Sequence, residues 1–533
     1  MGQEQKNRMA TNRKNLKYGI GTLWGAIFVA ILFFAHGAAR AAESGASEDE
    51  ALHVLNRMAF GPRPGEVARV MHMGIDRYID EQLYPAQIPM PPALSERLAQ
   101  LETQRMSDAE LIAQFREDQK RVKSDPDSGR AARRALYQRL GEQSGEARLI
   151  RAIESPRELE EVMVDFWFNH FNVFQGKGLD RVLVASYERE AIRPYVLGRF
   201  RDLLGATAHH PAMLFYLDNW LSSAPGFEGR GGAAAKGRPS GLNENYAREI
   251  MELHTLGVDG GYTQKDVTEL ARMLTGWTFD ASGRGDGSLF RFDARRHDWG
   301  QKTWLGNYVA PRGQAEGEFA LDVLASSRAT AHHISYELVQ YFVSDAPPPA
   351  LVERLAQRYL ATGGDIRAVL YTLFRSPEFR DPTDQSAKFK TPYQFVVSAV
   401  RATGVEVTNV RPLLGMLNQL GMPLYGCVTP DGYKNTEEAW LNPDGMSRRI
   451  GFATALAAGK IPLERAIDPQ TGLPLAFVDS GRSDLGSAHA LEVDPLLDTL
   501  GETISGKTLK AVAETEPALR AALVLGSPDF MRR

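Results

Sequence analysis

Side chains that can bind metal or move protons gather in three segments of this 533-residue chain. The candidate catalytic residues are His170, Glu244, Arg248, Glu249, His254, His297 and Asp298. The candidate metal ligands are His170, Glu249, His254 and His297, whose donor atoms suit zinc, manganese or iron. The lone Cys427 excludes thiolate clusters, and the sequence contains none of the common protease, esterase, phosphate-loop or cytochrome motifs. We therefore expect metal-assisted or acid–base chemistry, with a divalent metal as the candidate cofactor.

The pattern of residues 243–257 predicts an amphipathic helix. At about 100° per residue, its buried stripe consists of Tyr246, Ile250, Leu253 and Gly257. The opposite side carries Glu244, Arg248 and Glu252 at four-residue spacing, either as a solvated ladder of charges or as groups that bind a ligand. Glu249 and His254 flank the stripe, where side chains are half-buried. A half-buried carboxylate needs a cationic partner, so these two residues form either structural pairs or a metal or catalytic site.

His170 lies in a second predicted helix. It shares one helical face with Leu159, Met163 and Phe166, and it therefore points inward. An inward histidine is either a hydrogen-bonded core residue or a functional group. His332 and His333 are adjacent within another predicted helix, so they diverge by about 100° and cannot both face one site.

His297 and Asp298 lie in a predicted turn, next to Trp299 and Gly300. An imidazole beside a carboxylate is a usable acid–base or ligand pair, and loops often carry function. The alternative is a turn in which the aspartate side chain bonds to its own backbone. The residues alone do not decide between these interpretations.

Helical signals dominate the chain, so the predicted fold class is mainly α: a multi-helix globular domain with a small β-hairpin insertion. This domain spans residues 42–533. It includes a polar helical stretch at 103–147, a glycine-rich loop at 221–241 and the hairpin at 286–308. In the hairpin, we expect residues 290–292 to pair with residues 302–304.

Seven motifs are distributed over nearly the whole of this domain. They lie at residues 55–61, 166–171, 243–258, 297–306, 376–379, 430–433 and 527–530. In these motifs the chain resembles the domain of unknown function 1800 family. The resemblance implies an exported, largely helical bacterial protein without an established activity. It also implies a partner, a second exported protein that resembles sulfatases and phosphatases.

The first 41 residues have the three parts of a secretory signal peptide. A basic head is followed by an apolar run at residues 24–34 and by Ala39-Arg40-Ala41. Cleavage after Ala41 predicts a location in the periplasm or cell envelope, with no membrane association afterwards. The alternative is an uncleaved N-terminal anchor. The whole chain carries a formal charge of −4, which gives no global attraction for nucleic acid.

Two hypotheses of function remain open from the sequence. One is an envelope enzyme whose site combines His170, the helix at 243–257 and the turn at His297. The other is a non-catalytic binding or assembly protein that acts with an exported partner. Convergence of the polar candidates in one pocket favours the enzyme.

Overall fold

The computed structural model describes residues 46–227, 241–280, 289–381, 386–464 and 490–533. The predicted signal peptide and most of the predicted glycine-rich loop lie outside these residues. No helix among the described residues is long and apolar enough to cross a membrane.

The described residues form twenty-three α-helices and four short strands, so the predicted mainly-α fold with a small β insertion is confirmed. The first helices are α2 (Glu48–Met58), α3 (Glu66–Met73), α4 (Ile75–Leu83), α5 (Pro92–Gln100), α6 (Asp108–Ser124), α7 (Pro126–Glu154) and α8 (Glu158–His170). The next are α9 (Asp180–Ser186), α10 (Phe200–His209), α11 (Pro211–Tyr216), α12 (Asn245–Glu252) and α13 (Gln264–Met273). These are followed by α14 (Gln314–Ser326), α15 (Arg328–Phe342), α16 (Pro349–Thr362), α17 (Ile366–Phe374), α18 (Pro392–Thr403) and α19 (Arg411–Gln419). The last are α20 (Glu437–Trp440), α21 (Pro443–Ala457), α22 (Val493–Leu500), α23 (Gly506–Glu514) and α24 (Pro517–Leu525).

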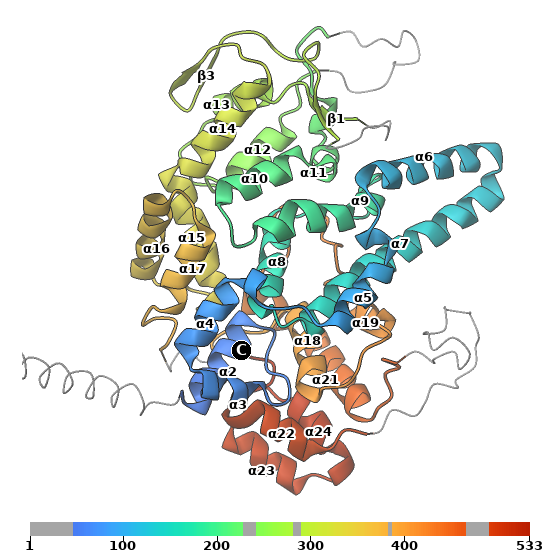
Figure 1. Cartoon of the computed structure of the whole chain (residues 1–533), viewed down its shortest axis with the longest axis vertical. Coiled ribbons are helices and arrows are strands. Elements are labelled where there is room, and N and C mark those ends of the chain that lie inside the picture. Colours follow the sequence, from blue (N-terminus) through green and yellow to red (C-terminus); the bar gives the residue numbers. More distant parts are fainter. Residues whose placement is uncertain (1–45, 228–240, 281–288, 382–385, 465–489) are drawn as a thin grey trace, which may run out of the picture.

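Helix α8 lies at the centre of the molecule (Figure 1). Val162, Met163, Val164 and Trp167 are fully buried, so this helix is covered on several sides. The packed pair α15 and α16 lies on one side of α8, and the hairpin of α6 and α7 projects on the other (Figure 1). The hairpin occupies the predicted polar stretch at 103–147, and Asp125 caps the start of α7. The surroundings of α8 therefore fix the position of its last residue, His170.

Buried ion pairs tie distant helices to this centre. On α7, Arg148 donates to Asp165 of α8 at 2.7 Å and to Glu188 at 3.2 Å. Arg401 of α18 donates to Glu158 at 2.6 Å. Removing one partner of such a pair leaves an uncompensated buried charge, so these contacts fix how the helices dock.

The four strands form two separate antiparallel hairpins. Strand β1 (Trp277–Phe279) pairs with β2 (Phe290–Phe292), and β3 (Lys302–Trp304) pairs with β4 (Asn307–Val309). The predicted pairing of residues 290–292 with 302–304 is therefore wrong. Leu305 and Gly306 both have positive φ, at 46° and 75°, which is the two-residue turn that joins twisted antiparallel strands. That local turn gives β3 a partner directly after it in the chain.

Candidate functional site

A polar cavity of about 270 Å³ lies where the end of α8 meets α15, the segment after α12 and the loop at residues 422–435. The acidic, basic and imidazole side chains that line it are Asp165, His170, Glu252, His333, Glu337, Asp431 and Lys434. These groups are far apart in the sequence, and only the tertiary fold brings them together. A cavity at which several polar groups converge is a candidate binding or active site.

His170 lies buried at this cavity, as its helical phase predicts. Its Nδ1 lies 2.7 Å from Glu337 Oε2, and its Nε2 lies 3.1 Å from the backbone oxygen of His254. Both partners are acceptors, so both ring nitrogens must carry hydrogen for the two bonds to form together. In this arrangement His170 is an imidazolium cation, and its contact with Glu337 is an ion pair.

The Glu337 carboxylate lies between two imidazoles. It is hydrogen-bonded to His170, whereas Nε2 of the second, His333, is 3.2 Å from the backbone oxygen of Leu253. The second oxygen of Glu337 lies 3.5 Å from Nε2 of His333, and the side chains of Glu337 and His333 are 29% and 24% exposed. Burial alone would raise the pKa of Glu337, but the charges of His170 and His333 outweigh burial and lower this pKa. Glu337 is therefore ionised at neutral pH. The carboxylate connects the buried His170 to an imidazole that is accessible from the cavity.

The helix predicted at residues 243–257 ends earlier, because α12 stops at Glu252. The Leu256 amide donates to the Met251 oxygen at 2.8 Å, and the Thr255 hydroxyl donates to the Ile250 oxygen at 2.6 Å. These five-residue spacings widen the turn and take the chain out of α-helical geometry. Sequence periodicity cannot show this change, because the apolar residues continue past Glu252.

His254 follows this wide turn and is 1% exposed rather than half-buried. Burial is the largest cause that holds its pKa well below the usual value, and the charges of His170 and His333 act in the same direction. His254 is therefore neutral at neutral pH. Within the described part of the chain, its Nε2 has no hydrogen-bond partner.

Glu337 and His333 line the cavity, although neither is among the site residues predicted from the sequence. The two residues are four apart on α15 and therefore lie on the same face, a spacing that the sequence displays. His332 is exposed, so only one of the two adjacent histidines reaches the cavity. Gly257 has φ of 82°, and an added Cβ there would lie 3.2 Å from Nδ1 of His333. A residue with a side chain at position 257 would therefore be strained and would crowd His333.

Asn169 fixes the loop that closes another side of the cavity. Its Nδ2 donates to the Tyr433 backbone oxygen at 2.8 Å, and its Oδ1 accepts from the Tyr433 amide at 2.7 Å. Gly432 passes so close that an added Cβ would lie 2.3 Å from the backbone oxygen of Asn169. Asp431 and Lys434 are thereby held at the cavity by the residue next to His170.

A family model described as "Protein of unknown function (DUF1800)" matches residues 53–532. The chain belongs to this family. No curated protein and no solved structure matches it. In this DUF1800 chain, three of the seven motifs, at residues 166–171, 243–258 and 430–433, contribute residues to the polar cavity. The motif at residues 297–306 contributes none of its lining.

Glu244, Arg248 and Glu249 lie outside the cavity lining of this DUF1800 protein. Glu244 accepts hydrogen bonds from Gln264 and Thr268 of α13, each at 2.7 Å, and Arg248 donates to Gln264 at 2.9 Å. These contacts join α12 to α13. Glu249 is half-buried, and burial, followed by repulsion from Glu252 and Asp431, raises its pKa.

His297 and Asp298 lie in a network of their own. His297 Nε2 is 3.1 Å from Glu316 Oε1, Lys302 Nζ is 2.6 Å from Glu316 Oε2, and all three side chains are fully buried. Asp298 accepts from Arg272 Nε at 2.8 Å and from the Gly300 amide at 2.8 Å. This network contributes nothing to the lining of the polar cavity, and its contacts fasten β3 and the preceding turn to α13 and α14.

The four predicted metal ligands do not converge. Over the described ranges, the three-residue group whose donor atoms lie within 4.8 Å of one another is Asp108, Glu190 and His210. Nδ1 of His210 accepts from the Ala212 amide at 3.1 Å, so the hydrogen of the neutral ring lies on Nε2. That nitrogen lies 3.3 Å from Asp108 Oδ2 but makes no hydrogen bond within the described part of the chain. The hydrogen bond that the His210 ring does make caps the start of α11 through Nδ1.

Proposed function

We propose that this protein is an exported enzyme that performs acid–base chemistry on a small polar group bound in the polar cavity. The observation that carries the proposal is the chain of contacts from His170 through Glu337 to His333. A carboxylate between two imidazoles can accept a proton from one and pass it to the other. Glu337 and His333 line the cavity and are the catalytic residues in this proposal. His170 acts through Glu337 and is a positioning residue.

The reaction class that we assign is proton abstraction from a hydroxyl group or an activated carbon of the substrate. Glu337 is ionised and partly exposed, so it can take up a proton directly. The imidazolium of His170 stabilises the ionised carboxylate from the buried side. The Lys434 ammonium, held 2.9 Å from Asp431, lies at the same cavity and can offset negative charge on the substrate. The cavity volume admits one small polar unit and not a whole polymer.

Acid–base chemistry is favoured over metal-assisted chemistry because of how the donor groups are used. Both nitrogens of His170 already face acceptors, and His254 reaches this site through its backbone oxygen. With both ring nitrogens donating, His170 has no free lone pair for a metal cation. The proposed chemistry therefore proceeds by proton transfer, with water present in the cavity.

The experiment uses the mature chain, which we expect to begin at Ala42. The purified protein is incubated in D₂O with a periplasmic extract of the producing cells, and mass spectrometry follows compounds that gain deuterium or change mass. We expect such a compound with the wild type and with His332→Gln, the exposed neighbour. Glu337→Gln and His333→Gln should lower the rate about 10²–10⁴-fold, the usual contribution of a proton-transfer group. His170→Gln should also shift the pH at which the rate is highest, because it removes the positive charge that lies next to Glu337 and lowers its pKa.

Two results would contradict the proposal. If the wild type changes no compound, the protein has the non-catalytic binding or assembly function instead. If the rate is equal in the wild type and in Glu337→Gln, the contacts from His170 through Glu337 to His333 take no part in the reaction. Circular dichroism of each variant shows whether the fold is retained.

A further inference from the structure

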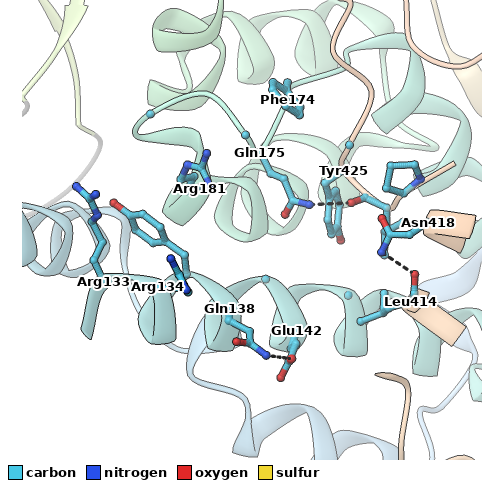
Figure 2. A pocket seen from close by; sticks show the side chains of 18 of the residues that line it. Arg133, Arg134, Gln138, Glu142, Phe174, Gln175, Arg181, Leu414, Asn418 and Tyr425 are labelled. Carbon is cyan, nitrogen blue, oxygen red and sulfur yellow. Dashed lines mark hydrogen bonds between the residues drawn. The ribbon is translucent and has the colours of Figure 1, made fainter. Parts of the chain in front are cut away.

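A second hollow of about 1180 Å³ runs along α7 (Figure 2). Its other walls are formed by α6, by residues 174–181 and by α19 with residues 423–426. Two neighbouring rows of α7 face it at four-residue spacing. They are Arg130, Arg134, Gln138 and Glu142, and Arg133, Tyr137, Gly141 and Gly145. At about 1.5 Å per residue, these rows line about 22 Å. We call this hollow the α7 groove, and it is long enough for several units of a polymer.

The α7 groove is strongly basic. Its lining has one carboxylate, Glu142, and five arginines, which are Arg130, Arg133, Arg134, Arg181 and Arg411. Arg411 is paired with Glu142 at 2.7 Å, and Arg130 is paired with Asp127. Within the described part of the chain, Arg133, Arg134 and Arg181 have no ion-pair partner. The whole chain has a formal charge of −4, so this positive charge is local to the groove. An anionic ligand would therefore meet three uncompensated guanidinium groups.

Aromatic rings and amides accompany the arginines. Phe115 and Tyr137 stack with ring centroids 6.2 Å apart, and the Arg181 guanidinium lies 5.5 Å from the Tyr137 ring. Gln175 and Asn418 reach the groove from the walls opposite α7 (Figure 2). Sugars are bound by such groups, because aromatic rings cover their apolar faces and amides bond to their hydroxyls. The Glu142 carboxylate can also accept from sugar hydroxyl groups.

We propose that the α7 groove binds a segment of an acidic polysaccharide, whose anionic groups pair with Arg133, Arg134 and Arg181. Planar carboxylates and tetrahedral sulfates both suit guanidinium donors, so either kind of acidic sugar supplies the same chemistry. This proposal goes beyond proton transfer at the polar cavity, and binding in the groove does not depend on catalysis there. Residues 422 and 423 are neighbours in one loop, and the first lines the cavity while the second lines the groove. A polymer in the groove would therefore lie next to the candidate active site.

The test measures binding by the mature chain with isothermal titration calorimetry. The probes are polygalacturonate, dextran sulfate, neutral dextran and a single-stranded oligonucleotide. The triple variant Arg133→Gln, Arg134→Gln and Arg181→Gln removes the three unpaired charges. A matched triple variant, Arg116→Gln, Arg121→Gln and Arg139→Gln, removes the same charge from α6 and α7 outside the groove lining.

We expect polygalacturonate or dextran sulfate to bind to the wild type, with an affinity that falls as salt rises. The groove variant should weaken this binding at least tenfold, and the matched variant less than twofold. The stronger of the two acidic probes identifies carboxylated or sulfated sugars as the source. The proposal is overturned if neither acidic probe binds, if both triple variants weaken binding equally, or if the oligonucleotide binds more tightly than both. If the groove variant loses binding but retains turnover, polymer binding in the groove is independent of catalysis at the cavity.

Discussion

The same two chemical groups, an imidazole and a carboxylate, form both the His170–Glu337 pair and the His297–Glu316 pair. Their surroundings differ. Glu316 is fully buried and receives Lys302 at 2.6 Å, the backbone amide of Arg312 at 2.8 Å and the imidazole of His297. Glu337 has a 29% exposed side chain that faces a cavity.

This difference separates a structural pair from a candidate catalytic one. In the sealed network, every partner of Glu316 is fixed, so a proton has nowhere to go and no substrate can approach. At the cavity, water or a substrate group can replace a partner of Glu337. A histidine beside a carboxylate therefore indicates function only when one of the two groups remains accessible.

The largest difference between the two regions should appear when each carboxylate is neutralised. Glu316→Gln leaves the Lys302 ammonium buried without its counter-charge, which should lower the free energy of unfolding by about 3–5 kcal/mol. Glu337→Gln should cost only about 1–2 kcal/mol, because cavity water can solvate the groups it leaves. Urea unfolding followed by circular dichroism measures both. Equal costs would show that the cavity is as tightly closed as the network around Glu316.

The pH dependence of stability should depend on His254, the buried histidine next to the cavity. The pKa of His254 is held well below its usual value in the folded chain, whereas the unfolded chain takes up this proton below about pH 6.5. The unfolded state then binds more protons, so stability should fall as pH drops below about 6.5, by up to about 1.4 kcal/mol per pH unit from this group. His254→Gln should flatten that slope, and His332→Gln, at an exposed position, should not.

His53 contributes to the same slope, because burial lowers its pKa to about 4. The measurement is therefore the difference between wild type and His254→Gln over pH 7.5–5, with His53 unchanged in both. If the two slopes coincide, His254 is charged in the folded chain, and the assignment of the cavity charge to His170 and His333 fails.

Much of the fold could be predicted from local sequence. Helical periodicity identifies α8 and gives the inward direction of His170, because a helix face is a property of neighbouring residues. Ser47 and Glu50 have the three-residue spacing that is typical of a helix N-terminus, and in the structure they form a reciprocal cap of α2. The β1–β2 and β3–β4 pairings could not be predicted by the same means, since pattern alone does not decide which nearby strand is the partner.

The composition of the candidate site could be predicted only in part. Glu337 is 167 positions from His170, and no local pattern links residues at that separation. The turn that carries His254 also depends on tertiary packing. His297 and Asp298 show the opposite error, because a local pair that is typical of catalysis is used here to fix a hairpin. Sequence gives the chemical types, and packing decides which of them share a cavity.

The smallest effect should come from Glu244→Gln, at a predicted site residue that contacts neither region. The Glu244 side chain is 34% exposed and lies 3.5 Å from Arg248. An exposed contact of this kind contributes about 0–1 kcal/mol, and salt screens it. The single oxygen of glutamine can still accept from Gln264, and its NH₂ group can donate to the Thr268 hydroxyl, which can donate to the Gln264 backbone oxygen. We therefore expect a loss near 0.5 kcal/mol in 0.1 M salt and less in 1 M salt. Turnover should not change, and neither should the slope of folding stability against pH below about pH 6.5. A larger loss, or a change in turnover, would mean that the α12–α13 contact sets the position of His254 and is coupled to the cavity.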